Sequence, residues 1–224
     1  NCRCWAEPAF GPDYADKDVS PADPLAYMNY NRNGQNARVI KAPSTGKEST
    51  REFKGTTDYK DVHLLEGIIK NQKDYESLCV FDRSGTHLST IKGDKTSVSI
   101  PANEIERLRD AIVTHNHPIG HRYKKNDPRN IGNSFSYEDI KTACSCDVAE
   151  MRAVTPVHRY IMKRPESGWD KKFFDRQVRP AYTKHRGDVL AEMKESIISG
   201  KQSPEEATSK VSHEIWLRVS RELN

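Results

Sequence analysis

The segment Ala111-Ile-Val-Thr-His-Asn-His-Pro118 predicts a buried β-strand that ends in two histidines and is stopped by a proline. Side chains two residues apart on a strand point to the same side of a sheet. His115 and His117 can therefore direct both imidazole rings at one point. A catalytic zinc site uses three protein ligands and leaves a fourth position for water. Pairs of histidines at this spacing are common in proteins that bind no metal there, so the pair alone does not predict a zinc site. The prediction needs a third protein ligand.

The segment Ser136-Tyr-Glu-Asp139 follows further along the chain and predicts the start of a helix. Serine is favoured at the N-cap, and a carboxylate is favoured in the first turn, where it meets the positive end of the helix dipole. This pattern alone indicates only a capped helix. After a strand that carries two histidines, however, Asp139 supplies the missing ligand. The order of the two segments therefore predicts a Zn²⁺ site made of His115, His117 and Asp139.

The sequence around these segments alternates between helical and strand-like patterns, which indicates an α/β (α+β) fold. Apolar residues at helical spacing predict helices at 60–71, 102–109 and 136–146. Short apolar runs between turn residues predict strands at 77–82, 87–91, 97–100, 111–117, 151–155 and 159–163. The long segment 119–135 is basic and rich in turn residues.

The two ends of the chain differ from this body, and we expect three regions. Residues 1–58 are poor in apolar side chains and rich in proline and polar residues, which predicts an irregular N-terminal arm. Residues 59–169 form the body. Residues 170–224 predict a C-terminal helical extension, with one helix stopped at Gly200 and a second that begins after an N-cap at Ser203.

Composition excludes several classes of protein. None of the 224 residues belongs to an apolar run of the roughly 20 residues that a membrane-spanning helix needs, so we expect no membrane partner. The net charge of +4 permits contact with nucleic acid but does not predict it. Five cysteines, an odd number, do not suit a disulfide-rich secreted scaffold and indicate a reducing compartment.

The order His-x-His-Pro and then Ser-x-x-Asp resembles the motif of the JAMM/MPN+ zinc metalloproteases. The likeness is strongest to the RadC-like branch and to JAMM-type domains attached to phage head proteins, and it spans Lys60 to Trp169. The resemblance implies a mixed β-sheet flanked by helices and hydrolysis of an amide or isopeptide bond in a protein substrate. It further implies that Ser136 helps to hold the oxyanion and that an upstream glutamate is the general base on the zinc-bound water.

Two glutamates are candidates for that base. The family's topology places the base at the start of the strand before the hairpin, where Glu76 stands. Glu66, on the preceding predicted helix, is the alternative. We favour Glu76 because of its position next to the buried strand.

The segment 119–135 is longer than the corresponding spacing in the family. This insertion either gates the site, binds an acidic partner, or displaces Asp139 and leaves the zinc site incomplete. It also contains His121, which is either an additional ligand or a solvated side chain.

The first residues, Asn1-Cys-Arg-Cys4, look like the closing residues of Mu F-type phage minor head proteins. The chain starts with asparagine, so we expect a piece upstream, and this likeness implies a Mu F-type capsid domain. It further implies capsid or portal proteins as partners and a location in the virion or the host cytoplasm. Cys2 and Cys4 are metal ligands or, more simply, ordinary thiols.

Two other functions compete with the peptidase. The first is a non-catalytic MPN-type module that serves as a capsid or interaction domain. The second is a RadC-like module that associates with nucleic acid, which would use the basic stretch 171–186 to track phosphates. In that interpretation the interleaved Phe173, Phe174 and Tyr182 stack on bases; otherwise they are core residues beside a solvated helix face.

Overall fold

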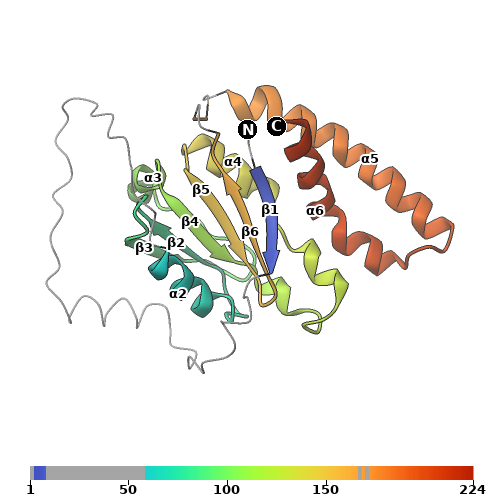
Figure 1. Ribbon diagram of the computed structural model, residues 1–224, viewed down its shortest axis with the longest axis horizontal. Coiled ribbons are helices and arrows are strands. Elements are labelled where there is room, and N and C mark those ends of the chain that lie inside the picture. Colours follow the sequence, from blue (N-terminus) through green and yellow to red (C-terminus); the bar gives the residue numbers. More distant parts are fainter. Residues whose placement is uncertain (1–2, 9–58, 166–167, 170–171, 224) are drawn as a thin grey trace, which may run out of the picture.

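A computed structural model describes residues 3–8, 59–165, 168–169 and 172–223, which form a mixed sheet with helices on both faces (Figure 1). The six strands lie in the order β1-β6-β5-β4-β2-β3, with β4 and β5 parallel and the other neighbours antiparallel. In chain order the strands are β1 (Arg3–Pro8), β2 (Ser77–Phe81), β3 (His87–Lys92), β4 (Ile112–Asn116), β5 (Glu150–Val154) and β6 (His158–Lys163). The predicted mixed α/β class is therefore confirmed.

The helices divide between the two faces of the sheet. They are α2 (Lys60–Ile69), α3 (Ala102–Leu108), α4 (Tyr137–Ser145), α5 (Arg179–Ile198) and α6 (Pro204–Glu222). Helix α2 buries its apolar stripe against one face, where Val62, Leu65 and Ile69 meet Phe81 and Ile112. Helices α4, α5 and α6 cover the other face, so β4 is buried on both sides.

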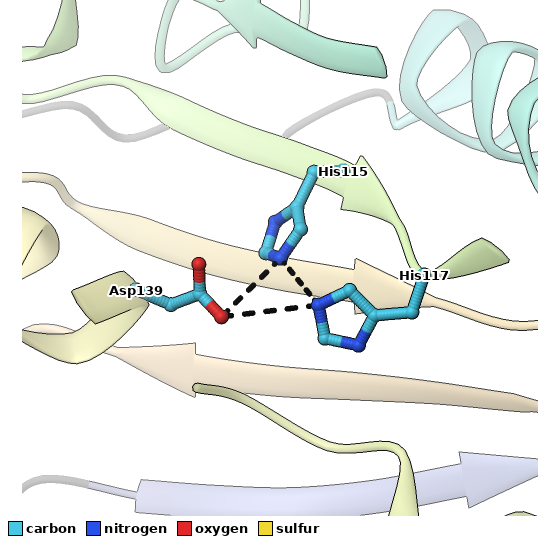
Figure 2. A group of neighbouring side chains, drawn as sticks. All are labelled: His115, His117 and Asp139. Atoms are coloured by element: carbon cyan, nitrogen blue, oxygen red, sulfur yellow. Dashed lines mark hydrogen bonds and ion pairs between the residues drawn. The ribbon is translucent and has the colours of Figure 1, made fainter. Parts of the chain in front are cut away.

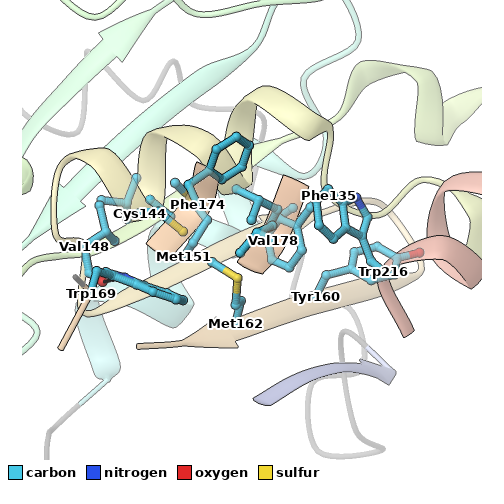
Figure 3. Close-up of a cluster of buried hydrophobic side chains, with 14 of the residues drawn as sticks. Phe135, Cys144, Val148, Met151, Tyr160, Met162, Trp169, Phe174, Val178 and Trp216 are labelled. Carbon is cyan, nitrogen blue, oxygen red and sulfur yellow. Dashed lines mark hydrogen bonds between the residues drawn. The ribbon is translucent and has the colours of Figure 1, made fainter. Parts of the chain in front are cut away.

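The larger core lies between α4, the C-terminal helices and the sheet (Figure 3). Met151 and Met162 from the central strands pack there with Trp216 of α6 and Val178, which ends a π-helical turn (Phe174–Val178) before α5. The C-terminal helices therefore share one core with the sheet. Two predictions about the ends of these helices are confirmed. Gly200 has a positive φ of 72° just after the end of α5, and Ser203 and Glu206 form a capping box at the start of α6.

The predicted arm at 1–58 is not irregular throughout, because β1 lies within it. This strand pairs with β6 in antiparallel register, from Arg3 opposite Lys163 to Pro8 opposite His158. Its partner lies more than half the chain away, so no local pattern announces the pairing. The rest of the predicted arm, residues 9–58, lies outside the described part of the chain.

The predicted strand at 97–100 is wrong. The Asp94 carboxylate accepts hydrogen bonds from the backbone N–H groups of Thr96 and Ser97, and this turn redirects the chain after β3. The segment that follows has no regular secondary structure and makes no ladder with a described strand. Val98 and Ile100 instead pack against the larger core.

In the part of the chain that the structure describes, no helix combines the length and the apolar character that crossing a bilayer requires.

Candidate metal centre

His115 and His117 lie at the end of β4 and point toward the start of α4 (Figure 2). His115 is the penultimate residue of the strand, and His117 follows its last residue. Their Nε2 atoms are 2.9 Å apart, and the His115 side chain is 4% exposed. The two-residue period of the strand thus brings both rings to one point, as predicted.

Asp139 completes the group from the first turn of α4. Its Oδ2 lies 3.5 Å from His115 Nε2 and 3.8 Å from His117 Nε2. A capping box holds the carboxylate: the Ser136 backbone N–H donates to Asp139 Oδ2 at 2.7 Å, and the Asp139 N–H donates to Ser136 Oγ at 3.1 Å. The cap orients the carboxylate toward the histidines. Asp139 can therefore cap α4 and serve as a metal ligand at the same time.

The spacing of these three atoms fits a tetrahedral zinc ion. Ligands at about 2.1 Å from a tetrahedral ion lie about 3.4 Å from one another. The observed separations of 2.9, 3.5 and 3.8 Å bracket that value. Among the described residues, these three side chains are the one group of potential ligands whose donor atoms all lie within 4.8 Å of one another.

Backbone carbonyls orient both rings. His117 Nδ1 lies 3.1 Å from the carbonyl oxygen of Asn133. A carbonyl can only accept, so Nδ1 carries the hydrogen and the lone pair of a neutral ring is on Nε2, which faces the centre. The His115 side chain has a backbone hydrogen bond to Arg152. Metal-binding histidines typically have outer partners of this kind, which fix the tautomer.

The electrostatics of the group suit a cation. Burial and the neighbouring His115 lower the pKa of His117 to about 4, so this ring is neutral near pH 7. Burial lowers the pKa of His115 as well, but the Asp139 carboxylate outweighs burial and the net pKa is raised. Burial raises the pKa of Asp139, yet the two histidines overcome it and hold this pKa below its usual range. Asp139 is therefore ionised.

We expect zinc affinity to rise with pH. Because the pKa of His115 is raised above its usual range, its ring keeps a proton to higher pH than a free imidazole does, and zinc must displace that proton. Below this pKa the apparent association constant should fall about tenfold per pH unit. Zinc titrations between pH 5.5 and pH 8 against a chromophoric chelator measure the slope. A pH-independent constant would contradict a histidine ligand.

Glu76 lies directly before β2. It lines a cavity of about 360 Å³ together with His115, His117 and Asp139. Burial raises the pKa of its carboxyl to about 7; Asp139 and Asp94 add to the rise and His115 opposes it. A carboxyl with a pKa near 7 can both accept and return a proton at neutral pH. The position and the pKa suit a general base.

Glu66 lies on the opposite face of the sheet and is fully buried. Its Oε1 accepts hydrogen bonds from Arg152 Nε at 2.6 Å and from Thr114 Oγ1 at 3.1 Å. Thr114 precedes His115 on β4, so its side chain points away from the histidines. The geometry thus favours Glu76 as the base and gives Glu66 a structural role in a buried ion pair.

Asn116 is a residue of this site whose role the sequence did not reveal. It stands between the two histidines but points to the other face, where its Oδ1 accepts the Ser77 N–H at 2.7 Å. Its amide also donates to the carbonyl oxygens of Gln72 and Tyr75, at 3.2 and 3.1 Å. These contacts flank Glu76 and hold its backbone relative to β4. Only the fold brings the two segments together.

The insertion at 119–135 does not displace Asp139. A short 3₁₀ helix, Pro118–His121, leads into it, and a second one, Pro128–Gly132, lies within it and packs against α6. His121 Nε2 is 2.9 Å from the carbonyl oxygen of Lys70 at the end of α2, so His121 is not part of the ligand group. The remaining candidate, Ser136, lines the cavity, and its hydroxyl already accepts from Asp139.

The described cysteines, Cys79, Cys144 and Cys146, form no disulfide with one another. None of them joins the ligand group. The side chains of Cys2 and Cys4 lie outside what the structure describes.

Comparisons with models of protein families, with curated protein sequences and with solved structures found no match.

Proposed function

We propose that this chain is a zinc-dependent hydrolase of amide or isopeptide bonds, of the kind that the JAMM/MPN+ metalloproteases represent. One observation carries the proposal: a strand end and a helix start bring two imidazoles and a carboxylate together, in a cavity that also contains Glu76. Three protein ligands beside an acid–base group are the arrangement of a catalytic rather than a structural zinc site.

Each residue then has a defined task. His115, His117 and Asp139 hold the ion, which when bound lowers the pKa of a water ligand and polarises the substrate carbonyl. Glu76 accepts the proton from the attacking water at its carboxylate and returns it to the leaving nitrogen. The Ser136 hydroxyl donates to the developing oxyanion, an interaction typically worth about 3 kcal/mol in such sites.

The cavity lining supports a peptide rather than a nucleic-acid substrate. Its carboxyl groups belong to Glu76, Glu138 and Asp139, and no lysine or arginine is among the described residues that line it. A nucleic-acid backbone would therefore find no cationic side chain here to neutralise its phosphates. The wall is apolar, with Leu78, Val98, Ile100 and Met151, and suits a peptide side chain. We further propose a protein of the phage head as the substrate, because the sequence resembles JAMM-type domains attached to phage head proteins.

The basic stretch near α5 does not offer the stacking surface that a nucleic-acid module needs. Phe174 is buried in the larger core, and Phe173 and Tyr182 pack against it. These aromatic residues therefore serve the core, which leaves the non-catalytic MPN-type module as the principal alternative.

The test is a combined metal and cleavage assay on the purified full chain. We expect one zinc per chain after incubation with zinc and removal of excess, and cleavage of amide bonds in a mixed peptide library read by mass spectrometry. A strong chelator should stop cleavage, and zinc should restore it. Bound zinc without cleavage of peptides or isopeptide conjugates would favour the non-catalytic module, whereas absence of zinc would refute the metal site.

A further inference from the structure

Helix α6 holds the insertion through a contact that requires glycine. The second 3₁₀ helix of the insertion ends at Gly132, whose backbone lies directly on the backbone of α6. A Cβ atom at Gly132 would lie 1.2 Å from the carbonyl oxygen of Ser209, a distance that no side chain can occupy. The insertion is therefore seated on α6 in van der Waals contact with its main chain.

Two hydrogen bonds fix the same segment on either side of this contact. The Tyr160 hydroxyl of β6 donates to the carbonyl oxygen of Ile131 at 2.9 Å, and Tyr160 as a residue is 1% exposed. The Ser212 hydroxyl of α6 donates to the carbonyl oxygen of Phe135 at 3.0 Å. An ion pair between Arg129 and Glu205, at 3.0 Å, also links the insertion to α6. The segment 131–135 is thus held at three of its five positions.

Asn133 lies between these fixed positions, and its carbonyl oxygen accepts the hydrogen bond from His117 Nδ1 at 3.1 Å. The contacts of α6 and Tyr160 therefore determine where that acceptor stands. None of Tyr160, Ser209 or Ser212 is among the residues that line the metal cavity. Their influence on the metal passes through the Asn133 carbonyl and the ring of His117.

We propose that helix α6 and Tyr160 are positioning elements of the metal centre: by holding the segment 131–135 they orient His117, so that zinc binding and the docking of α6 are coupled. The inference rests on the zinc site proposed above and assigns the C-terminal helices a role in it. Coupling is reciprocal, so zinc should in turn stabilise the docked insertion and α6.

The first test measures zinc affinity of the full chain by competition with a chromophoric chelator. Loss of an outer partner of a metal-binding histidine typically lowers metal affinity about 10- to 100-fold. We expect Gly132→Ala, which must displace the segment or the helix, to lower zinc affinity about tenfold or more. Tyr160→Phe keeps the ring and should lower it by a smaller factor, about threefold to tenfold.

Gly187→Ala in α5 is the matched control, because a Cβ there meets nothing within 4 Å. It should bind zinc as the wild type does. Tyr160→Phe keeps the test meaningful if Gly132→Ala fails to fold. Wild-type affinity in a folded Tyr160→Phe, and in Gly132→Ala where that variant folds, would overturn the coupling while leaving the zinc site intact. A wild type without zinc would instead refute the proposed function itself.

Amide hydrogen exchange supplies a second readout that does not depend on activity. Added zinc should slow exchange in 128–135 and in α6 of the wild type, and this protection should shrink in Tyr160→Phe. Exchange in α2, which packs on the other face of the sheet, serves as the internal reference. Zinc-induced protection confined to β4 and α4 would contradict the coupling.

Discussion

Replacement of His115 or of Asp139 should abolish zinc binding at micromolar metal. His115→Ala leaves two ligand atoms where the site needs three, and Asp139→Asn replaces the anionic carboxylate ligand with a neutral amide, a much weaker ligand for zinc. The loss should exceed the roughly 10- to 100-fold that removal of an outer-shell partner causes. Asp139→Asn is the sharper variant, because an amide oxygen can still accept the Ser136 N–H that caps α4. It removes the negative charge and preserves the helix start.

The control for these variants is His121→Ala. His121 is the histidine of the insertion, and its ring contacts the Lys70 carbonyl instead of the cavity. It should keep wild-type zinc stoichiometry, measured by elemental analysis, while circular dichroism checks folding of all three variants. Loss of zinc in His121→Ala together with retention in His115→Ala would place the metal elsewhere and refute the site.

The parts of the site that could be predicted are those whose geometry depends on only a few consecutive residues. The convergence of His115 and His117 follows from the two-residue period of a strand, and the placement of Asp139 follows from a helix cap that spans four residues. Both are local rules of backbone geometry. The distance between the strand end and the helix start is not local, and here the resemblance to a known motif supplied the expectation.

The parts that could not be predicted depend on contacts between distant segments. The sequence alone did not exclude Glu66 as the base, because a helix can pack on either face of a sheet. In the structure Glu66 forms an ion pair with Arg152 on the face opposite the histidines. Asn116 and Asn133 act through hydrogen bonds whose partners lie in other segments. The strand expected at 97–100 failed for a related reason, since a strand needs a neighbour and its sequence does not specify one.

Glu76→Gln should separate metal binding from chemistry. The glutamine keeps the size of the side chain and leaves His115, His117 and Asp139 in place, so zinc affinity should stay within a few-fold of wild type. Hydrolysis should fall by about 100- to 10,000-fold, the range typical of a lost general acid–base group, because an amide cannot accept the proton of the attacking water. The rate at zinc saturation, with any peptide that the library assay identifies, measures the effect.

Two glutamates provide controls for this prediction. Glu138→Gln changes a carboxylate on the exposed rim of the same cavity and should alter the rate far less than Glu76→Gln. Glu66→Gln weakens a buried ion pair with Arg152 and should lower thermal stability while the folded fraction keeps its rate. If Glu66→Gln stopped hydrolysis in the folded protein and Glu76→Gln did not, the proton acceptor would have to act from the other side of the sheet. Glu66 is fully buried and bonded to Thr114 on the face of the sheet opposite the histidines, so this pair of variants tests the mechanism at the point where it is most specific.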